Sequence, residues 1–207
     1  GQGGAPACYI IEEHFKRFIV GQDPRNLNKI WDQMFLSSRY YGGKGLPLWA
    51  ISAVDLALWD LIGILRQEPV YQIIGGAVRD EIELYCTGAR PDLAKESGFI
   101  GGKMPIPHGP ADRIEGLNAN VDKFREMREK VGPNFHLMAD CWMALDVPYA
   151  VDLAYALREL GVYWIEEALH PDDFDGYKLL KERAPWIRWT SGEHEYTRYG
   201  FRKLIES

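Results

Sequence analysis

Between residues 81 and 194, apolar residues gather in five short runs, separated mostly by stretches of helical periodicity. A short apolar run bounded by turn residues is typical of a buried strand, and apolar residues three and four positions apart are typical of an amphipathic helix. The runs predict strands at 81–89, 98–105, 134–142, 162–168 and 187–194, and the other stretches predict helices at 111–131, 148–160, 173–184 and 199–207. This alternation predicts a parallel sheet of about five βα units.

Residues 1–80 follow a different, mainly helical pattern. Apolar spacing predicts helices at 10–20 and 27–35, and a Gly-Gly-Lys-Gly break precedes a third predicted helix at 46–65. The third segment is apolar nearly all round, so we expect it to be buried. Its length would suit a membrane span, but Asp55 and Asp60 in its middle would each cost ~2.5–3.5 kcal/mol at the bilayer centre. A soluble, domain-bridging helix is the better interpretation.

Three acidic residues stand at the ends of the last three predicted strands. Asp140 is followed after 26 residues by Glu166, which is followed after 27 residues by Glu193, and this is about the length of one βα unit. In a β/α barrel the chemistry lies at the carboxyl ends of the strands. Carboxylate oxygens are hard ligands that suit Mg²⁺. We therefore predict that the three acids bind one Mg²⁺ ion, the alternative for each being a helix N-cap or a surface charge.

Composition and charge disfavour several other classes of protein. The net charge is −6 and Lys and Arg are scattered, which argues against a nucleic-acid partner. Cys8, Cys86 and Cys141 have neither CxxC nor Cys–His spacing, so we expect no disulfide framework, no zinc site and a cytoplasmic location. No predicted strand is followed by GxGxxG, which disfavours a dinucleotide-binding protein. No membrane partner is expected.

The barrel-like pattern is too short for a closed barrel. A complete β/α barrel takes about 250 residues and eight units, and only about five units are predicted here. The chain also begins without an initiator methionine. We therefore expect a fragment, and we expect the isolated chain to be unstable or to aggregate because both edges of its sheet are unpaired.

Several longer motifs resemble those of a known family. AVDLALWDLIG, GGAVRDEIELY, MADCWM, YWIEEAL and TSGEH are similar to segments of the enolase superfamily in its mandelate-racemase-like branch, and within it of the L-rhamnonate dehydratases. The resemblance implies an α/β fold: a partial, modified (β/α) TIM-type barrel at 81–207, preceded at 1–80 by the later, mainly helical part of an α+β capping domain. It implies Mg²⁺ ligation by Asp140, Glu166 and Glu193, and selects Glu166 over the adjacent Glu167.

The resemblance also implies an activity. Such enzymes dehydrate acid sugars, here L-rhamnonate to 2-keto-3-deoxy-L-rhamnonate, by abstracting the proton next to a carboxylate while Mg²⁺ stabilises the enediolate. The full-length form would be a homo-oligomer that acts on a small acid sugar. The alternatives are a dehydratase or racemase for another aldonate, such as galactonate, and an inactive truncated product.

Two further residues are candidates for catalysis. Related enzymes carry a Lys-x-Lys pair after the second barrel strand, and this chain has Lys103 but Pro105 in place of the second lysine. Lys103 either faces the site or caps a strand end. His194 matches a histidine of the family that would hydrogen-bond substrate or act as an acid, unless its position beside Glu193 on a strand turns it away. The resemblance places the main base, a histidine, beyond Ser207.

Overall fold

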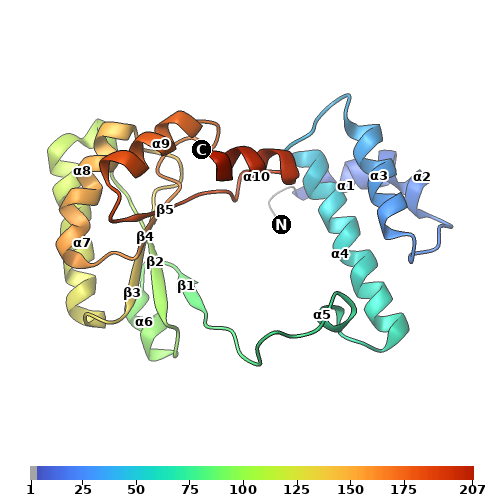
Figure 1. The fold of residues 1–207 in the computed structure, drawn as a ribbon, viewed down its shortest axis with the longest axis horizontal. Coiled ribbons are helices and arrows are strands. Elements are labelled where there is room, and N and C mark those ends of the chain that lie inside the picture. Colours follow the sequence, from blue (N-terminus) through green and yellow to red (C-terminus); the bar gives the residue numbers. More distant parts are fainter. Residues whose placement is uncertain (1–3) are drawn as a thin grey trace. The chain divides into compact units, whose positions relative to one another are not determined.

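The computed structural model describes residues 4–207, which form two compact units (Figure 1). One unit comprises the chain up to Asp80 together with Tyr196–Tyr199, and the other comprises Glu81–Glu195 and Gly200–Ser207. The boundary after residue 80 separates a segment of helices from a segment of alternating strands and helices. The start of helix α10 (Thr197–Glu206) is grouped with the helical unit.

Helices are the regular elements of the first unit among its described residues. Its elements are α1 (Gly4–Ile10), the π-helical turn η1 (Ile11–Phe15), α2 (Lys16–Ile19), α3 (Leu27–Ser38), α4 (Leu46–Arg66) and α5 (Val70–Ile73). The helix predicted at 10–20 is thus the later part of a longer helical run. Phe15, Ile30, Met34 and Ile51 are at most 1% exposed and form the centre of this unit's core.

Helix α4 has one buried face and one exposed face. Its buried apolar side chains include Leu48, Ile51, Val54, Leu58 and Ile62. In contrast, Leu56 is 70% exposed and Ile64 is 66% exposed. The prediction of burial all round is wrong, because α1 and α3 pack along one side of α4 and leave the other side open. By length and composition the helix could cross a membrane, but core helices of soluble proteins meet the same two criteria.

The second unit is built on one five-stranded parallel sheet. Its strands are β1 (Tyr85–Thr87), β2 (Gly101–Pro105), β3 (His136–Asp140), β4 (Trp164–Glu166) and β5 (Arg188–Thr190). Each strand pairs with its successor in the chain, so the order is β1-β2-β3-β4-β5. Sequential parallel pairing is the arrangement of a β/α barrel wall and confirms the predicted fold class.

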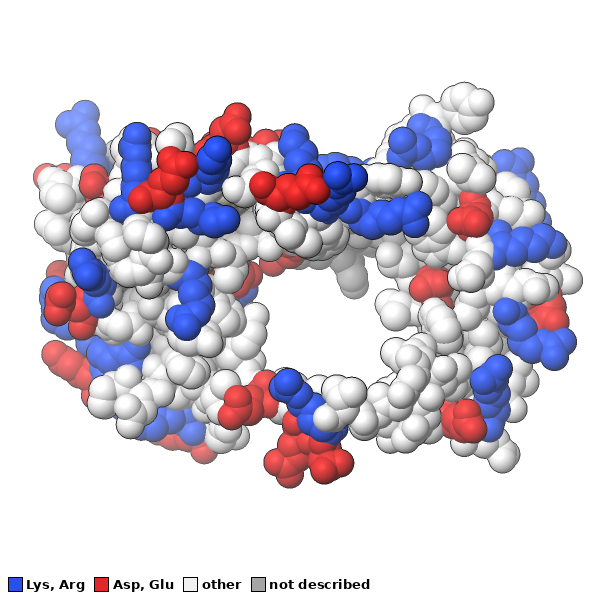
Figure 2. Space-filling model, viewed as in Figure 1, with Lys and Arg blue, Asp and Glu red and all other residues white. Residues whose placement is uncertain are grey.

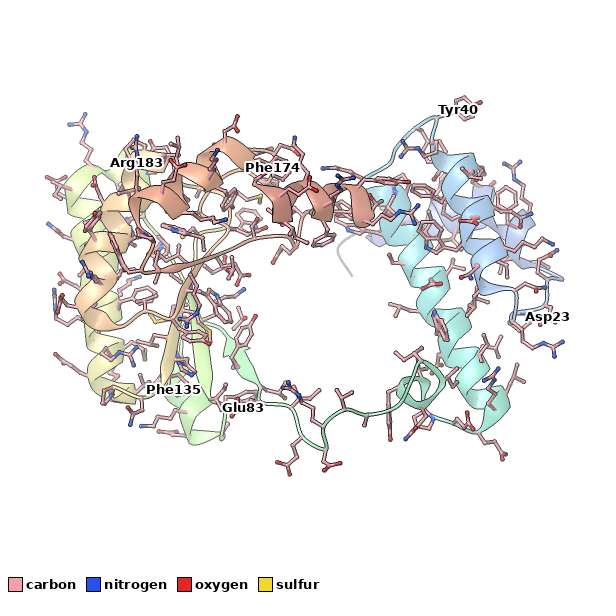
Figure 3. All side chains as sticks on the ribbon, in the orientation of Figure 1. Asp23, Tyr40, Glu83, Phe135, Phe174 and Arg183 are labelled. Atoms are coloured by element: carbon pink, nitrogen blue, oxygen red, sulfur yellow. The ribbon has the colours of Figure 1, made fainter. Side chains whose placement is uncertain are left out.

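Helices connect the strands and cover one face of the sheet. They are α6 (Pro91–Glu96), α7 (Arg113–Val131), α8 (Val147–Leu157) and α9 (Phe174–Arg183), with short 3₁₀ turns at η2 (Pro110–Asp112) and η3 (Arg158–Leu160). Helices α7 and α8 pack against each other, as do α8 and α9, and all three lie on the same side of the sheet (Figure 1). Leu137 and Ile165 of the sheet are fully buried in the same core as Phe124 and Leu153 of the helices. Phe174, labelled in Figure 3, is buried at the start of α9, and the Lys203 ammonium lies 4.2 Å from its ring centroid.

The strands are shorter than predicted, which changes the position of one candidate segment. The run at 187–194 pairs with β4 only over Arg188–Thr190, because the backbone leaves the sheet after Thr190. Glu193 and His194 therefore lie in the loop that follows β5, and the expectation that they are consecutive residues of a strand is wrong. Helix α6 was not predicted, because it has only six residues and these show no clear helical periodicity.

Charged side chains are mixed over the surface. Figure 2 shows Lys and Arg interspersed with Asp and Glu over most of the face in view.

Candidate metal centre

Two of the three predicted acids end neighbouring strands at the same level. Asp140 is the last residue of β3 and Glu166 is the last residue of β4, and the two are partners in the strand register. Asp140 is also the register partner of Pro105, the last residue of β2. The carboxyl ends of β2, β3 and β4 therefore meet at one edge of the sheet.

The ammonium group of Lys103 lies between these two carboxylates. Its Nζ is 2.5 Å from Glu166 Oε1 and 3.1 Å from Asp140 Oδ2, and the residue is only 5% exposed. Burial lowers the pKa of Lys103, but hydrogen bonds to Glu166 and Asp140 and their negative charges outweigh it, so the pKa is raised. Lys103 therefore faces the strand-end acids, one of the two orientations expected for it, and carries its charge at neutral pH.

Further hydrogen bonds fix the two carboxylates in place. Glu166 accepts a second hydrogen bond at Oε2 from the indole Nε1 of Trp164, at 3.2 Å. Asp140 accepts at Oδ1 from the backbone N–H of Trp142, also at 3.2 Å. Because each oxygen has its own donor, the orientation of both carboxylates is set by the protein before any ligand binds.

Glu193 and Glu166 line the same small pocket. The pocket has a volume of about 240 Å³ and is lined by Tyr85, Trp164, Glu166, Glu167, Thr190, Ser191 and Glu193. Among the described residues, Glu167 Oε2 and Thr190 Oγ1 are buried without a hydrogen-bond partner. Buried polar atoms are normally paired, so two unpaired oxygens among the residues that line this pocket are a departure that a functional site can explain.

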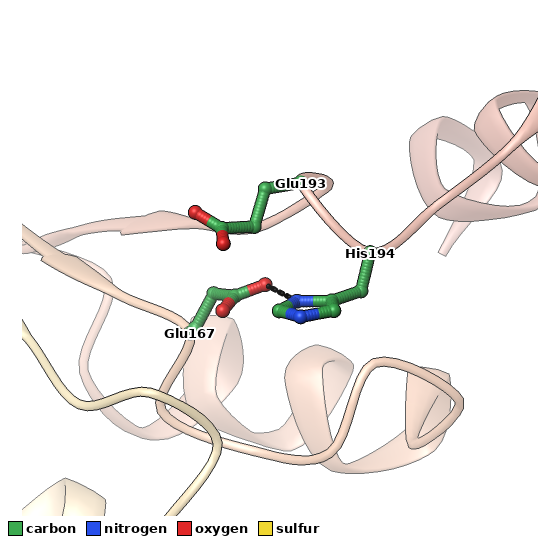
Figure 4. A group of neighbouring side chains, drawn as sticks. All are labelled: Glu167, Glu193 and His194. Atoms are coloured by element: carbon green, nitrogen blue, oxygen red, sulfur yellow. Dashed lines mark hydrogen bonds and ion pairs between the residues drawn. The ribbon is translucent and has the colours of Figure 1, made fainter. Parts of the chain in front are cut away.

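Glu167 was not among the residues predicted for the site. It is 1% exposed, and its Oε1 lies 2.8 Å from Nδ1 of His194 (Figure 4). Burial raises the pKa of Glu167, and the hydrogen bond from His194 opposes this shift. The doubled Glu166-Glu167 at a strand end was a signal for a second functional acid, because two carboxylates so close to a buried strand both need polar partners.

The acids thus form two adjacent groups. Asp140 and Glu166 share Lys103, whereas Glu167, Glu193 and His194 bring one possible ligand atom each to within 4.8 Å of one another. Glu166 and Glu193 line the same pocket and connect the groups. A set dominated by carboxylate oxygens, with an ammonium group already among them, fits a hard divalent cation better than a soft one.

Two models of known protein families match the sequence of the chain. The family model described as the mandelate racemase / muconate lactonizing enzyme N-terminal domain matches residues 5–75. The model described as the enolase C-terminal domain-like family matches residues 90–207, which is more than half of the chain.

Individual relatives agree with the family models. The chain is 59% identical over 204 residues to an L-rhamnonate dehydratase of Saccharopolyspora erythraea, covering 98% of this chain and 52% of that protein. The crystal structure of L-rhamnonate dehydratase from Gibberella zeae superposes with a TM-score of 0.95 at 52% identity, over 98% of this chain and 52% of that one. A structure of the Gibberella zeae enzyme complexed with Mg has a TM-score of 0.94, also at 52% identity, over 97% of this chain and 50% of that one.

The chain matches only part of the length of each of these relatives. The chain spans about half the length of the curated relative that it matches. Within that span, the order of a helical unit followed by parallel βα units agrees with an N-terminal capping domain followed by a TIM-barrel-like domain. The chain therefore belongs to the enolase superfamily, with an N-terminal domain of the mandelate racemase / muconate lactonizing enzyme type and an enolase-like C-terminal domain.

Proposed function

We propose that the whole protein is a Mg²⁺-dependent dehydratase that converts L-rhamnonate to 2-keto-3-deoxy-L-rhamnonate. The observation that carries the proposal is the Asp140–Lys103–Glu166 arrangement at the strand ends, in a chain 59% identical to an L-rhamnonate dehydratase. A related structure that contains Mg adds support for the metal.

Asp140, Glu166 and Glu193 are the residues that would hold the cation. When bound, a divalent cation at these oxygens would supply positive charge to offset the negative charge that builds up on a substrate carboxylate as its neighbouring carbon loses a proton. The trio offers three negative charges, and Lys103 offsets one of them. Trp164 holds Glu166 from the opposite oxygen, so the ligand set is preorganised on one side.

Lys103 and His194 are the candidates for direct contact with substrate. The Lys103 ammonium already binds carboxylates, so it can also bind an acid sugar's carboxylate when a cation occupies the acids. His194 has one ring nitrogen engaged by Glu167 and a side chain that is 28% exposed, which leaves the other nitrogen available to a substrate hydroxyl. We assign removal of the C2 proton to neither residue.

Turnover by the whole protein tests the proposal. L-rhamnonate is incubated with the protein and Mg²⁺, and the 2-keto product is trapped with semicarbazide and measured. We expect product formation that EDTA abolishes and added Mg²⁺ restores. A panel with D-galactonate and 3,6-anhydro-D-galactonate tests other aldonates. The second substrate is included because the chain resembles the 3,6-anhydro-D-galactonate cycloisomerase from Zobellia galactanivorans. The two are 31% identical with a TM-score of 0.91, over all of this chain and 59% of the cycloisomerase.

Two outcomes would overturn the dehydratase assignment. Exchange of the C2 hydrogen with solvent deuterium, without loss of water from any substrate, would indicate a racemase or epimerase. Absence of both exchange and product at saturating Mg²⁺ would indicate a protein without this catalytic activity.

A further inference from the structure

Glu167 has an unusual backbone conformation for a residue with a side chain. It directly follows the last residue of β4, and its φ is +45°, in the left-handed region. Its N–H donates to the Thr190 carbonyl at 2.9 Å, and its carbonyl accepts from the N–H of Met143 at 2.6 Å. Such strain persists only where the surroundings hold it, and it occurs most often at functional sites.

The carboxylate of Glu167 has one described partner, the imidazole of His194. The two residues are 27 positions apart in sequence, on the loops that follow β4 and β5. Oε1 lies 2.8 Å from Nδ1, while Oε2 is buried without a partner among the described residues. No arginine or lysine is paired with this carboxylate in the described part of the chain, so the side chain is not placed for an ordinary ion pair.

A carboxylate in this position controls which nitrogen of the ring carries the proton. An ionised carboxylate can only accept, so Nδ1 must donate, and in a neutral imidazole Nε2 is then an acceptor. Figure 4 shows the ring with Nδ1 toward Glu167 and the second nitrogen turned away from it. Such a pair fixes both the orientation of the ring and its tautomer, as outer-shell carboxylates do for other histidines.

His170 provides an internal comparison in the loop after β4. Its Nδ1 accepts a hydrogen bond from the backbone N–H of Asp172 at 3.3 Å. A nitrogen that accepts carries no proton, so the neutral His170 ring must carry its proton on Nε2. The two histidines are therefore expected to be opposite tautomers in one protein.

We propose that Glu167 is a positioning residue, which holds His194 as the Nδ1–H tautomer and presents Nε2 as an acceptor for a hydroxyl group of the acid sugar. The catalytic consequence rests on the proposed dehydratase function. The tautomer itself does not, because it follows from the 2.8 Å hydrogen bond between a neutral His194 ring and an ionised Glu167. Glu167 touches His194 and is assigned no direct contact with substrate.

The first test is the ¹⁵N NMR spectrum of histidine-labelled whole protein, without substrate. His194→Asn and His170→Asn assign the two rings. We expect His194 in the Nδ1–H form and His170 in the Nε2–H form. Glu167→Leu, which removes the acceptor, should shift His194 toward Nε2–H and leave His170 unchanged. An Nε2–H tautomer for His194 in the wild type, or one that is unaltered in Glu167→Leu, would overturn the proposal.

The second test is a double-mutant cycle in turnover. Glu167→Leu should lower kcat by ~10–100-fold, the usual range for an outer-shell partner. In the His194→Asn background, the same substitution should have little further effect, because residues that act as a unit are non-additive. Glu167→Gln, whose amide oxygen can still accept from Nδ1, should recover part of the kcat lost in Glu167→Leu.

The outcomes separate the two proposals. Losses that multiply in the double variant would show that Glu167 acts independently of His194 and would overturn its positioning role. If no acid sugar is turned over by the wild type, the dehydratase proposal fails, and the NMR experiment still decides the tautomer. If Glu167→Leu does not fold, the wild-type spectrum carries the NMR test: an Nδ1–H tautomer for His194 supports the proposal and an Nε2–H tautomer contradicts it.

Discussion

Lys103 reaches from β2 across β3 to Glu166 on β4, where its Nζ lies 2.5 Å from Oε1. The side chains are 7% and 14% exposed, so water screens the pair only weakly. Asp140 on the intervening strand is the third member, at 3.1 Å from Nζ. One lysine thus contacts two of the acids proposed to bind Mg²⁺ and offsets one of their negative charges, which has consequences for the stability of the metal-free protein.

Replacing Lys103 by Met should destabilise the protein most when metal is absent. Removing one partner of a buried ion pair leaves an uncompensated charge, typically at a cost of about 3–5 kcal/mol. Mg²⁺ would replace the lost positive charge. We therefore expect a clear loss of unfolding free energy in EDTA and a smaller loss in Mg²⁺, both measured by urea denaturation.

Lys130→Met is the matched control for Lys103→Met. Lys130 pairs with Glu126 at 2.6 Å, but the two side chains are 47% and 66% exposed. Exposed pairs of this kind contribute about 0–1 kcal/mol, so the control should be nearly neutral with or without metal. Equal losses for Lys103→Met in EDTA and in Mg²⁺ would argue against a shared role of Lys103 and the cation.

Glu193→Gln should abolish turnover and weaken Mg²⁺ binding while the fold is retained. The substitution removes one negative charge from the proposed ligand set, and charge on the cation's ligands matters most in the transition state. Calorimetric titration with Mg²⁺, turnover at saturating Mg²⁺ and circular dichroism measure the three quantities. Glu182→Gln, at an exposed position on α9, controls for loss of a carboxylate. Near-wild-type turnover by Glu193→Gln would contradict its assignment as a ligand.

The regular part of the fold could be predicted from the sequence because it depends on apolar periodicity. Strand order and the positions of Asp140 and Glu166 at strand ends follow from alternating βα units, and all are found in the structure. Periodicity could not show where pairing stops, so Glu193 and His194 were placed on a strand instead of in a loop.

The partner of His194 could not be predicted, since the position of Glu167 depends on a left-handed backbone that strand alternation does not encode. Whether Lys103 faces the acids depends on the length of its side chain and the stagger of three strands. The open face of α4 was missed for another reason. A segment's hydrophobicity shows that it can be buried, but not how many neighbours cover it.

The three thiols should differ strongly in reactivity. Cys8 is exposed, Cys86 is partly exposed and Cys141 is buried. Burial raises the pKa of Cys141, and the charges of Asp140 and Glu166 raise it further. A raised pKa lowers the thiolate fraction at neutral pH, and the thiolate is the reactive form. We expect iodoacetamide to modify Cys8 first and Cys141 only after unfolding, as measured by peptide mass spectrometry. Rapid labelling of Cys141 in the native protein would contradict the burial.

Asn120→Ala should destabilise the loop that follows β2. Asn120 is fully buried; its Nδ2 donates to the His108 carbonyl at 2.9 Å and to Tyr149 Oη at 3.2 Å. The His108 N–H donates to Asn120 Oδ1 at 3.3 Å, so alanine would leave this N–H without its acceptor, and an unpaired buried polar group costs ≈ 1–3 kcal/mol. Urea denaturation should show a loss in that range. Asn118→Ala, at an exposed position on the same helix, should change stability by no more than about 0.5 kcal/mol. Equal effects of the two substitutions would show that helix propensity, and not the buried hydrogen bonds, determines the result.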